Sequence, residues 1–210
     1  MTTNFKKVAS FVCVGGLILL AGIIGIGISD AYLNQKRAER VLMAFRTVRV
    51  GSTDRARALQ IAGLSPTHRY EGKVYEFPEW VFHYDNGLLF RMHLSPYTSF
   101  DATLVFKDEV VQEKEVRVFI ASGFAALVNE RTRGFRLPNG ITTSKDLPHN
   151  VVFSRNSLTN VRTLSVYDDD SYGEKELAID WVVDLGCMSK LCGCKDAREI
   201  LPNIRLQLDE

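Results

Sequence analysis

Residues 8–28 read VASFVCVGGLILLAGIIGIGI, an apolar run without a charged side chain, with Lys6 and Lys7 before it and Asp30 shortly after it. An α-helix rises about 1.5 Å per residue, so a helix of this length spans about 30 Å, the thickness of the hydrocarbon core of a bilayer. The run therefore predicts a transmembrane helix near the N-terminus, with residues 1–30 forming a short cytoplasmic stub and the membrane segment.

Length and flanking residues distinguish a retained anchor from a cleaved signal sequence. A secretory signal has an apolar core of about 7–15 residues and ends at a small-x-small cleavage site. The run is longer than this, and Ser29-Asp30-Ala31 matches such a site only loosely, so we favour a single-pass, uncleaved signal-anchor. The basic pair before the run favours a cytoplasmic N-terminus and an extracytoplasmic remainder, although the basic residues between positions 36 and 40 count against this orientation.

Small residues recur at four-residue spacing within the run, at Ala21, Gly25 and Ser29. Residues at this spacing lie on one face of a helix, and small side chains there let two membrane helices approach closely. This face is therefore a candidate packing surface for a homodimer.

The next part of the chain, residues 31–66, is predicted to hold two juxtamembrane helices. Apolar residues between positions 31 and 49 follow the i, i+3, i+4, i+7 spacing of an amphipathic helix, namely Ala38, Val41, Leu42, Phe45 and Val48. Ser52 or Thr53 can then cap a second, short helix, with Asp54 in its first turn. We expect this short helix to turn residues 58, 59, 61 and 62 inward.

From Pro66 onward the apolar period changes from that of a helix to that of a strand. Trp80, Phe82 and Tyr84 alternate with more polar residues, and a second alternation follows between positions 88 and 94. A three-residue loop with Gly87 in the left-handed conformation would place the apolar side chains of both runs on one face. We therefore predict a β-hairpin over residues 80–94.

Further strands are expected at residues 102–106, 116–121, 151–154, 161–167 and 177–185. Residues 132–150 are rich in glycine, proline and asparagine, which predicts a long loop or a sub-boundary. The predicted fold class is α+β, with an N-terminal transmembrane helix, one or two further helices and then a mainly antiparallel sheet (a meander) over residues 67–210.

Three cysteines, Cys187, Cys192 and Cys194, lie in one short C-terminal segment. Their C-x4-C-x-C spacing lacks the fourth ligand and the paired spacing of a closed zinc site. In an oxidising compartment two of them would form a disulfide, and Cys187–Cys194 or Cys187–Cys192 is preferred because a Cys192–Cys194 bond would be strained. We rank a structural disulfide above inert thiols, and inert thiols above metal or redox chemistry.

Charge and motifs argue against several classes of function. The net charge is +1, and beyond the two lysines of the stub the chain carries 24 basic and 25 acidic residues, which argues against a nucleic-acid-binding surface. The chain has no P-loop, dinucleotide-binding glycine motif, nucleophile elbow or zinc-protease motif. Residues 168–173 (DDDSYG) match only the start of an EF-hand loop and are expected to form a polar hairpin loop. We assign no catalytic residue, metal ligand or cofactor.

Residues 50–54 (VGSTD) begin the short helix, residues 62–66 (AGLSP) end it, and a strand carrying residues 80–82 (WVF) follows. This order, over about residues 41–106, resembles the SmpA/OmlA (BamE-like) outer-membrane assembly modules, which have a "G-hydrophobic-T/S" helix start, a "G-x-P" and a "W-x-Y" element. Here the glycine-to-proline segment is one residue longer, phenylalanine replaces the tyrosine, and the lipoprotein cysteine of that family is absent. The resemblance implies a two-helix, three-strand interaction module rather than an enzyme.

Together these features predict a single-pass protein of the cell membrane whose extracytoplasmic α+β domain binds another protein or an envelope component. One alternative is a membrane-tethered, hydrolase-like enzyme whose active site is assembled from distant residues, with loop 132–150 contributing to it. The other alternative places the domain in the cytoplasm, where the three C-terminal thiols would stay reduced and form a metal or redox site.

Overall fold

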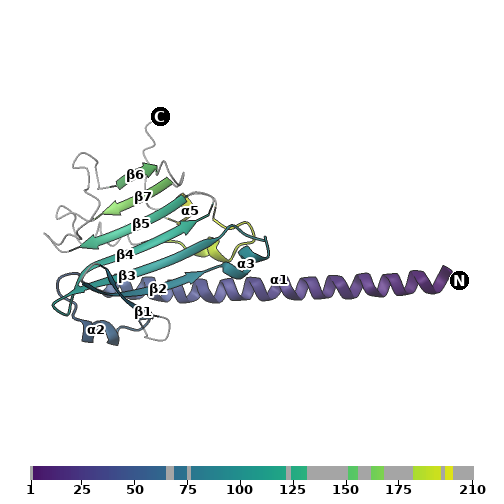
Figure 1. The fold of residues 1–210 in the computed structure, drawn as a ribbon, viewed down its shortest axis with the longest axis horizontal. Coiled ribbons are helices and arrows are strands. Elements are labelled where there is room, and N and C mark those ends of the chain that lie inside the picture. The colour runs from purple at the N-terminus through teal and green to yellow at the C-terminus, as the bar shows by residue number, and fades with distance from the viewer. Residues whose placement is uncertain are drawn as a thin grey trace.

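The computed structural model describes residues 2–64, 69–74, 77–121, 124–131, 151–155, 162–167, 182–194 and 197–200. The helices are α1 (Thr2–Thr47), α2 (Arg55–Gln60), α3 (Gly87–Arg91), the 3₁₀ helix η3 (Gly186–Ser189) and α5 (Ala197–Ile200). The strands are β1 (Arg69–Val74), β2 (Phe77–Asp85), β3 (Thr98–Lys107), β4 (Val110–Ile120), β5 (Phe124–Arg131), β6 (Val151–Arg155) and β7 (Arg162–Tyr167). Figure 1 shows α1 projecting far beyond the sheet towards the N-terminus.

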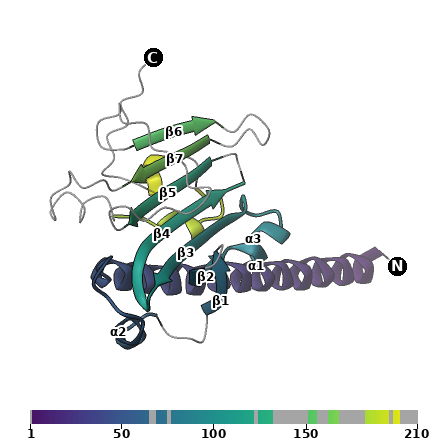
Figure 2. The same ribbon diagram turned by 60° about the vertical axis from the view of Figure 1, so that its left-hand side comes forward.

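The described strands form one seven-stranded sheet in the order β1-β2-β3-β4-β5-β7-β6. Strands β1 to β5 are an antiparallel meander in which each strand pairs with the next one along the chain. Strand β7 then pairs parallel with β5 and antiparallel with β6. The predicted α+β class with a mainly antiparallel sheet is confirmed. Figure 2 shows the second half of α1 running alongside the end of the sheet that holds β1 and β2.

Helix α1 is one continuous helix of 46 residues with two different surroundings. Residues 12–26 of its apolar run are exposed almost all round, and Leu17, Ile18 and Leu19 are each 66–68 % exposed. Its second half is amphipathic, and the whole predicted apolar stripe is buried: Ala38, Val41, Leu42, Phe45 and Val48. Among the described residues, this is the one helix long and apolar enough to cross a membrane.

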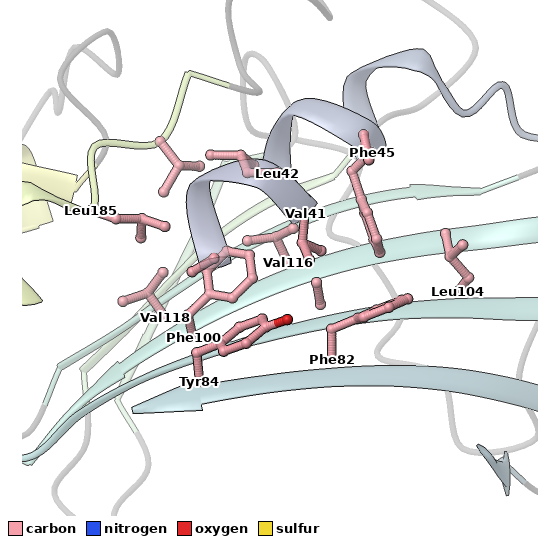
Figure 3. Close-up of a cluster of buried hydrophobic side chains, with 14 of the residues drawn as sticks. Val41, Leu42, Phe45, Phe82, Tyr84, Phe100, Leu104, Val116, Val118 and Leu185 are labelled. Carbon is pink, nitrogen blue, oxygen red and sulfur yellow. The ribbon is translucent and has the colours of Figure 1, made fainter. Parts of the chain in front are cut away.

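The core of the domain lies between the second half of α1 and one face of the sheet (Figure 3). Alternate residues of β2, Trp80, Phe82 and Tyr84, point into it and are buried. Phe45 of α1 meets Phe82 edge to face, with the ring centroids 6.2 Å apart. Burying a side chain of this size stabilises a fold by about 1.5–3 kcal/mol, so the helix that carries the apolar run also contributes the centre of the core.

The C-terminal end of α1 is held by a buried lysine of β4. The Nζ atom of Lys114 donates to the carbonyl oxygens of Phe45, at 3.2 Å, and Val48, at 2.9 Å. The last carbonyls of a helix lack partners within the helix and carry partial negative charge. Lys114 supplies both a donor and a positive charge there, and this contact fixes the far end of α1 to the sheet.

The predicted hairpin over residues 80–94 is wrong. Strand β2 pairs with β3, so that Trp80 lies opposite Leu104 and Tyr84 lies opposite Phe100. The residues predicted as its second strand form α3 and the turn after it instead. The apolar residues between 88 and 94 also fit a helical spacing, because Leu89 and Met92 are three residues apart and both contact Gly27 of α1.

Four of the five other predicted strands are found: residues 102–106 lie in β3, 116–120 in β4, 151–154 in β6 and 162–167 in β7. The fifth prediction, residues 177–185, lies mostly outside the described residues, and its described part, 182–185, belongs to no strand. The short helix α2 exists, but its N-cap is Asp54 rather than Ser52 or Thr53, because the Asp54 carboxylate accepts from the Arg57 amide at 2.6 Å. Ala58 is buried as expected, whereas Leu59 is 47 % exposed.

Candidate functional site: the corner around α3

The end of β2, helix α3 and the start of β3 form a tight corner of the chain, residues 83–101, which we call the α3 corner. A buried asparagine, Asn86, holds it together. Its Nδ2 atom donates to Ser95 Oγ at 3.1 Å and to the Pro96 carbonyl at 3.0 Å, and its Oδ1 atom accepts from the Thr98 amide at 2.8 Å. Because every one of these contacts crosses the loop, the corner has a defined shape.

Asp85 connects the corner to the long helix. One carboxylate oxygen accepts from the Gly87 amide at 2.9 Å, and the other accepts from the Tyr97 hydroxyl at 3.2 Å. The backbone carbonyl of Asp85 accepts from Asn34 Nδ2 of α1 at 3.0 Å. The position of α3 relative to α1 therefore depends on polar contacts as well as on apolar packing.

A histidine lies between two carboxylates on the sheet face that points away from α1. Nδ1 of His83 is 2.6 Å from Asp101 Oδ1, and Nε2 is 3.3 Å from Asp85 Oδ2. Burial disfavours the charged imidazolium, but the hydrogen bonds and charges of Asp101 and Asp85 outweigh it, so the pKa of His83 is raised above its ordinary value. Only the imidazolium can donate to both carboxylates at once.

This geometry makes His83 a structural group. A catalytic base needs a ring nitrogen free to take a proton from a nucleophile, and both nitrogens of His83 face carboxylates. The two hydroxyls in the network also lie against the carboxylates: that of Tyr97 is 3.2 Å from Asp85 Oδ2 and that of Ser99 is 3.4 Å from Asp101 Oδ2. Within the described part of the chain, no group of three or more His, Cys, Asp or Glu residues is arranged to hold a metal ion.

Beside α3 the surface has an open hollow of about 620 Å³. Its lining combines apolar, aromatic and charged side chains: Asp30, Asp85, Gly87, Leu88, Phe90, Arg91, Tyr97 and Ala121. Phe90 and Tyr97 meet edge to face, with ring centroids 5.6 Å apart. The presence of Asp30 places the hollow where α1 changes from the apolar run to the domain.

The C-terminal cysteine segment covers another side of α1. Cys187 and Cys194 form a disulfide and are both buried, whereas Cys192 is exposed and unpaired. The Ser189 hydroxyl donates to Gln35 Oε1 of α1 at 2.6 Å. The disulfide, one of the two pairings expected from the sequence, therefore closes a loop that packs on the same half of α1 as the sheet.

The small-residue face of the apolar run is open in the single chain. Ala21, Gly25 and Ser29 are all exposed, and the Ser29 hydroxyl donates back to the Gly25 carbonyl at 2.8 Å. Gly27 of the same run, whose role was not predicted from the sequence, does contact the domain. A Cβ atom at Gly27 would lie 3.0 Å from Met92 Sδ and 3.1 Å from Leu89 Cδ2, so glycine is what lets α3 approach the helix.

Several residues considered from the sequence lie outside the described residues, namely loop 132–150 and the acidic segment 168–173. No family model, curated protein or solved structure matches the chain. The resemblance to the SmpA/OmlA modules therefore stays a prediction.

Proposed function

We propose that the protein is a single-pass membrane protein whose α+β domain lies outside the cytoplasm and serves as an interaction or assembly module. One observation carries this proposal: residues 12–26 of α1 are apolar and exposed almost all round, whereas the second half of α1 is buried in the centre of the domain. A helix that is apolar all round needs an apolar surrounding. A bilayer supplies it, and the domain is then held close to the membrane without a flexible linker.

Two features support an extracytoplasmic domain. Disulfides persist in oxidising compartments and are rare in the cytosol, and the Cys187–Cys194 pair is buried against the core. Lys6 and Lys7 precede the apolar run, and basic residues flanking a span favour the cytoplasmic side.

A homodimer is the partner arrangement that the helix itself favours. The face with Ala21, Gly25 and Ser29 continues, at helical spacing, to the exposed Tyr32 just after the apolar run. Two copies meeting along this face would bury its small residues within the membrane. A second protein of the envelope is the other partner class, in line with the assembly-module resemblance.

Thiol labelling tests the anchoring and the orientation together. Cys192 is exposed and unpaired, so a membrane-impermeant maleimide should label it in intact cells, and Cys192→Ser should abolish the signal. In that background, Thr3→Cys should be labelled only after permeabilisation. Labelling of Cys192 that requires permeabilisation would overturn the orientation, and release of the chain from membranes by alkaline carbonate would overturn the anchoring.

A further inference from the structure

The domain contacts α1 within the apolar run itself, not only after it. Gly27 is buried, and the atoms nearest to it belong to Leu89 and Met92, the inner face of α3 and the residue that follows it. Gly27 is the second-last residue of the apolar run 8–28. Helix α3 therefore packs against the last turn of the apolar run. The run also needs this turn to reach across the hydrocarbon core of a bilayer.

Simple helix geometry sets the depth of α3. At about 1.5 Å per residue the run fills the roughly 30 Å hydrocarbon core, so its last turn lies at the boundary between acyl chains and headgroups. A helix packed beside that turn lies at the same level. Both ribbon views place α3 at the end of the domain that faces the projecting, N-terminal part of α1 (Figures 1 and 2).

The outward side of α3 has the chemistry of a membrane interface. Phe90, the fourth of the five residues of α3, is 45 % exposed, and Leu88 is half-buried on the wall of the hollow beside it. Arg91 follows directly and is exposed. Phenylalanine and leucine are typical of the apolar face of a helix that lies at the headgroup–acyl boundary, and an arginine can extend its stem along apolar surface while its guanidinium stays among phosphates.

We propose that α3 is a second, interfacial membrane contact, in which Phe90 enters the boundary of the same bilayer that α1 spans and Arg91 meets lipid phosphates. This inference rests on the proposed membrane anchoring and adds to it. With two contacts, α1 and α3, the bilayer fixes the tilt and rotation of the domain. The hollow beside α3 then opens at the lipid surface.

Depth-dependent quenching tests this contact. The full chain carrying Phe90→Trp is reconstituted into phosphatidylcholine–phosphatidylglycerol vesicles with brominated acyl chains. The matched control is Leu59→Trp, because Leu59 is similarly exposed, at 47 %, but lies on α2 at the opposite end of the domain. The native tryptophans, Trp80 and Trp181, are common to both variants and are subtracted with the unmodified chain.

We expect the Phe90→Trp signal to shift to shorter wavelength and to be quenched severalfold more than the Leu59→Trp signal. Equal quenching of the two variants would overturn the interfacial contact. A third variant, Leu19→Trp, reports on the anchor itself. Strong quenching there without quenching at position 90 refutes only the role of α3, whereas no quenching at position 19 refutes the anchoring on which it rests.

Discussion

Residues 8–28 of α1 carry no charged side chain, whereas the second half of the helix combines apolar and charged residues, and this difference in pattern decides what each half contacts. In the apolar run apolar residues occur on every side, and between positions 12 and 26 they stay largely exposed in the folded chain. In the second half they form a stripe, and the stripe is buried against the sheet and the C-terminal segment. One continuous helix can therefore serve two different environments, with the change taking place between Gly27 and Ala31.

The largest predicted difference in unfolding free energy comes from removing one large side chain from each half of α1. Phe45→Ala deletes a fully buried ring that meets Phe82, and such deletions cost about 3–5 kcal/mol of unfolding free energy. Leu19→Ala removes exposed atoms and should leave the stability of the domain unchanged. Denaturant unfolding of the detergent-solubilised chain, followed by the fluorescence of buried Trp80, measures both. Similar losses of unfolding free energy for the two variants would contradict the different roles of the two halves of α1.

The second-largest loss of unfolding free energy should come from removing the disulfide, because it closes the segment that packs on the second half of α1. The bond joins residues seven positions apart, and loop-closure entropy for so short a loop gives about 2.5 kcal/mol. We expect Cys187→Ser combined with Cys194→Ser to lower the unfolding free energy by about this amount. Cys192→Ser, which removes an unpaired thiol, is the control and should have no effect. A double variant as stable as the unmodified chain would show that this bond does not support the fold.

Two nearby glycines of the apolar run, Gly25 and Gly27, differ in whether the domain packs against them. Gly27→Leu places side-chain atoms where Leu89 and Met92 lie and should destabilise the domain by about 1–3 kcal/mol, the range for overpacked sites. Nothing lies within 4 Å of a Cβ at Gly25, so Gly25→Leu should leave the unfolding free energy of the domain unchanged. The melting temperatures of both variants in the same detergent give the result. A Gly25→Leu loss equal to that of Gly27→Leu would contradict the packing of α3.

The smallest predicted effect on folding stability is that of His83, and this effect depends on pH. Its pKa is raised in the folded chain above the ordinary value of 6.5, so the folded state binds the proton more tightly than the unfolded state does. The stabilisation is fully present below about pH 6.5 and is lost as the pH rises through the folded-state pKa.

Because His83 is partly exposed, we expect an effect within about 1 kcal/mol. Melting temperatures between pH 5.5 and 8.5 should show His83→Gln losing stability mainly at the acid end. His93→Asn is the control, because His93 is exposed and asparagine tolerates its left-handed backbone (φ 57°). A pH-independent difference would refute the ion pairs.

The length of the uncharged run predicted the membrane helix, and periodicity predicted the amphipathic helix after it and most of the described strands, because each depends on residues close together in sequence; the structure joins the two helices into α1. The α3 corner could not be predicted in this way. Residues 88–94 fit a strand and a short helix equally well, and the choice depends on Asn86, whose partners lie 9–12 residues away. Gly27 was missed for a similar reason, since a glycine in an apolar run acquires its meaning only from the α3 residues beside it.

The apolar run of α1 is proposed to lie in lipid, whereas the second half is proposed to lie outside the bilayer, with its outer side facing water. Leu19 and Met43 allow a direct test, because they are equally exposed in the folded chain, at 66 % and 64 %. Each is changed to cysteine in a chain that carries Cys13→Ser and Cys192→Ser and is reconstituted into vesicles opened to reagent on both sides. A water-soluble maleimide should label position 43 readily and position 19 hardly at all. Equal labelling rates at the two positions would contradict the claim.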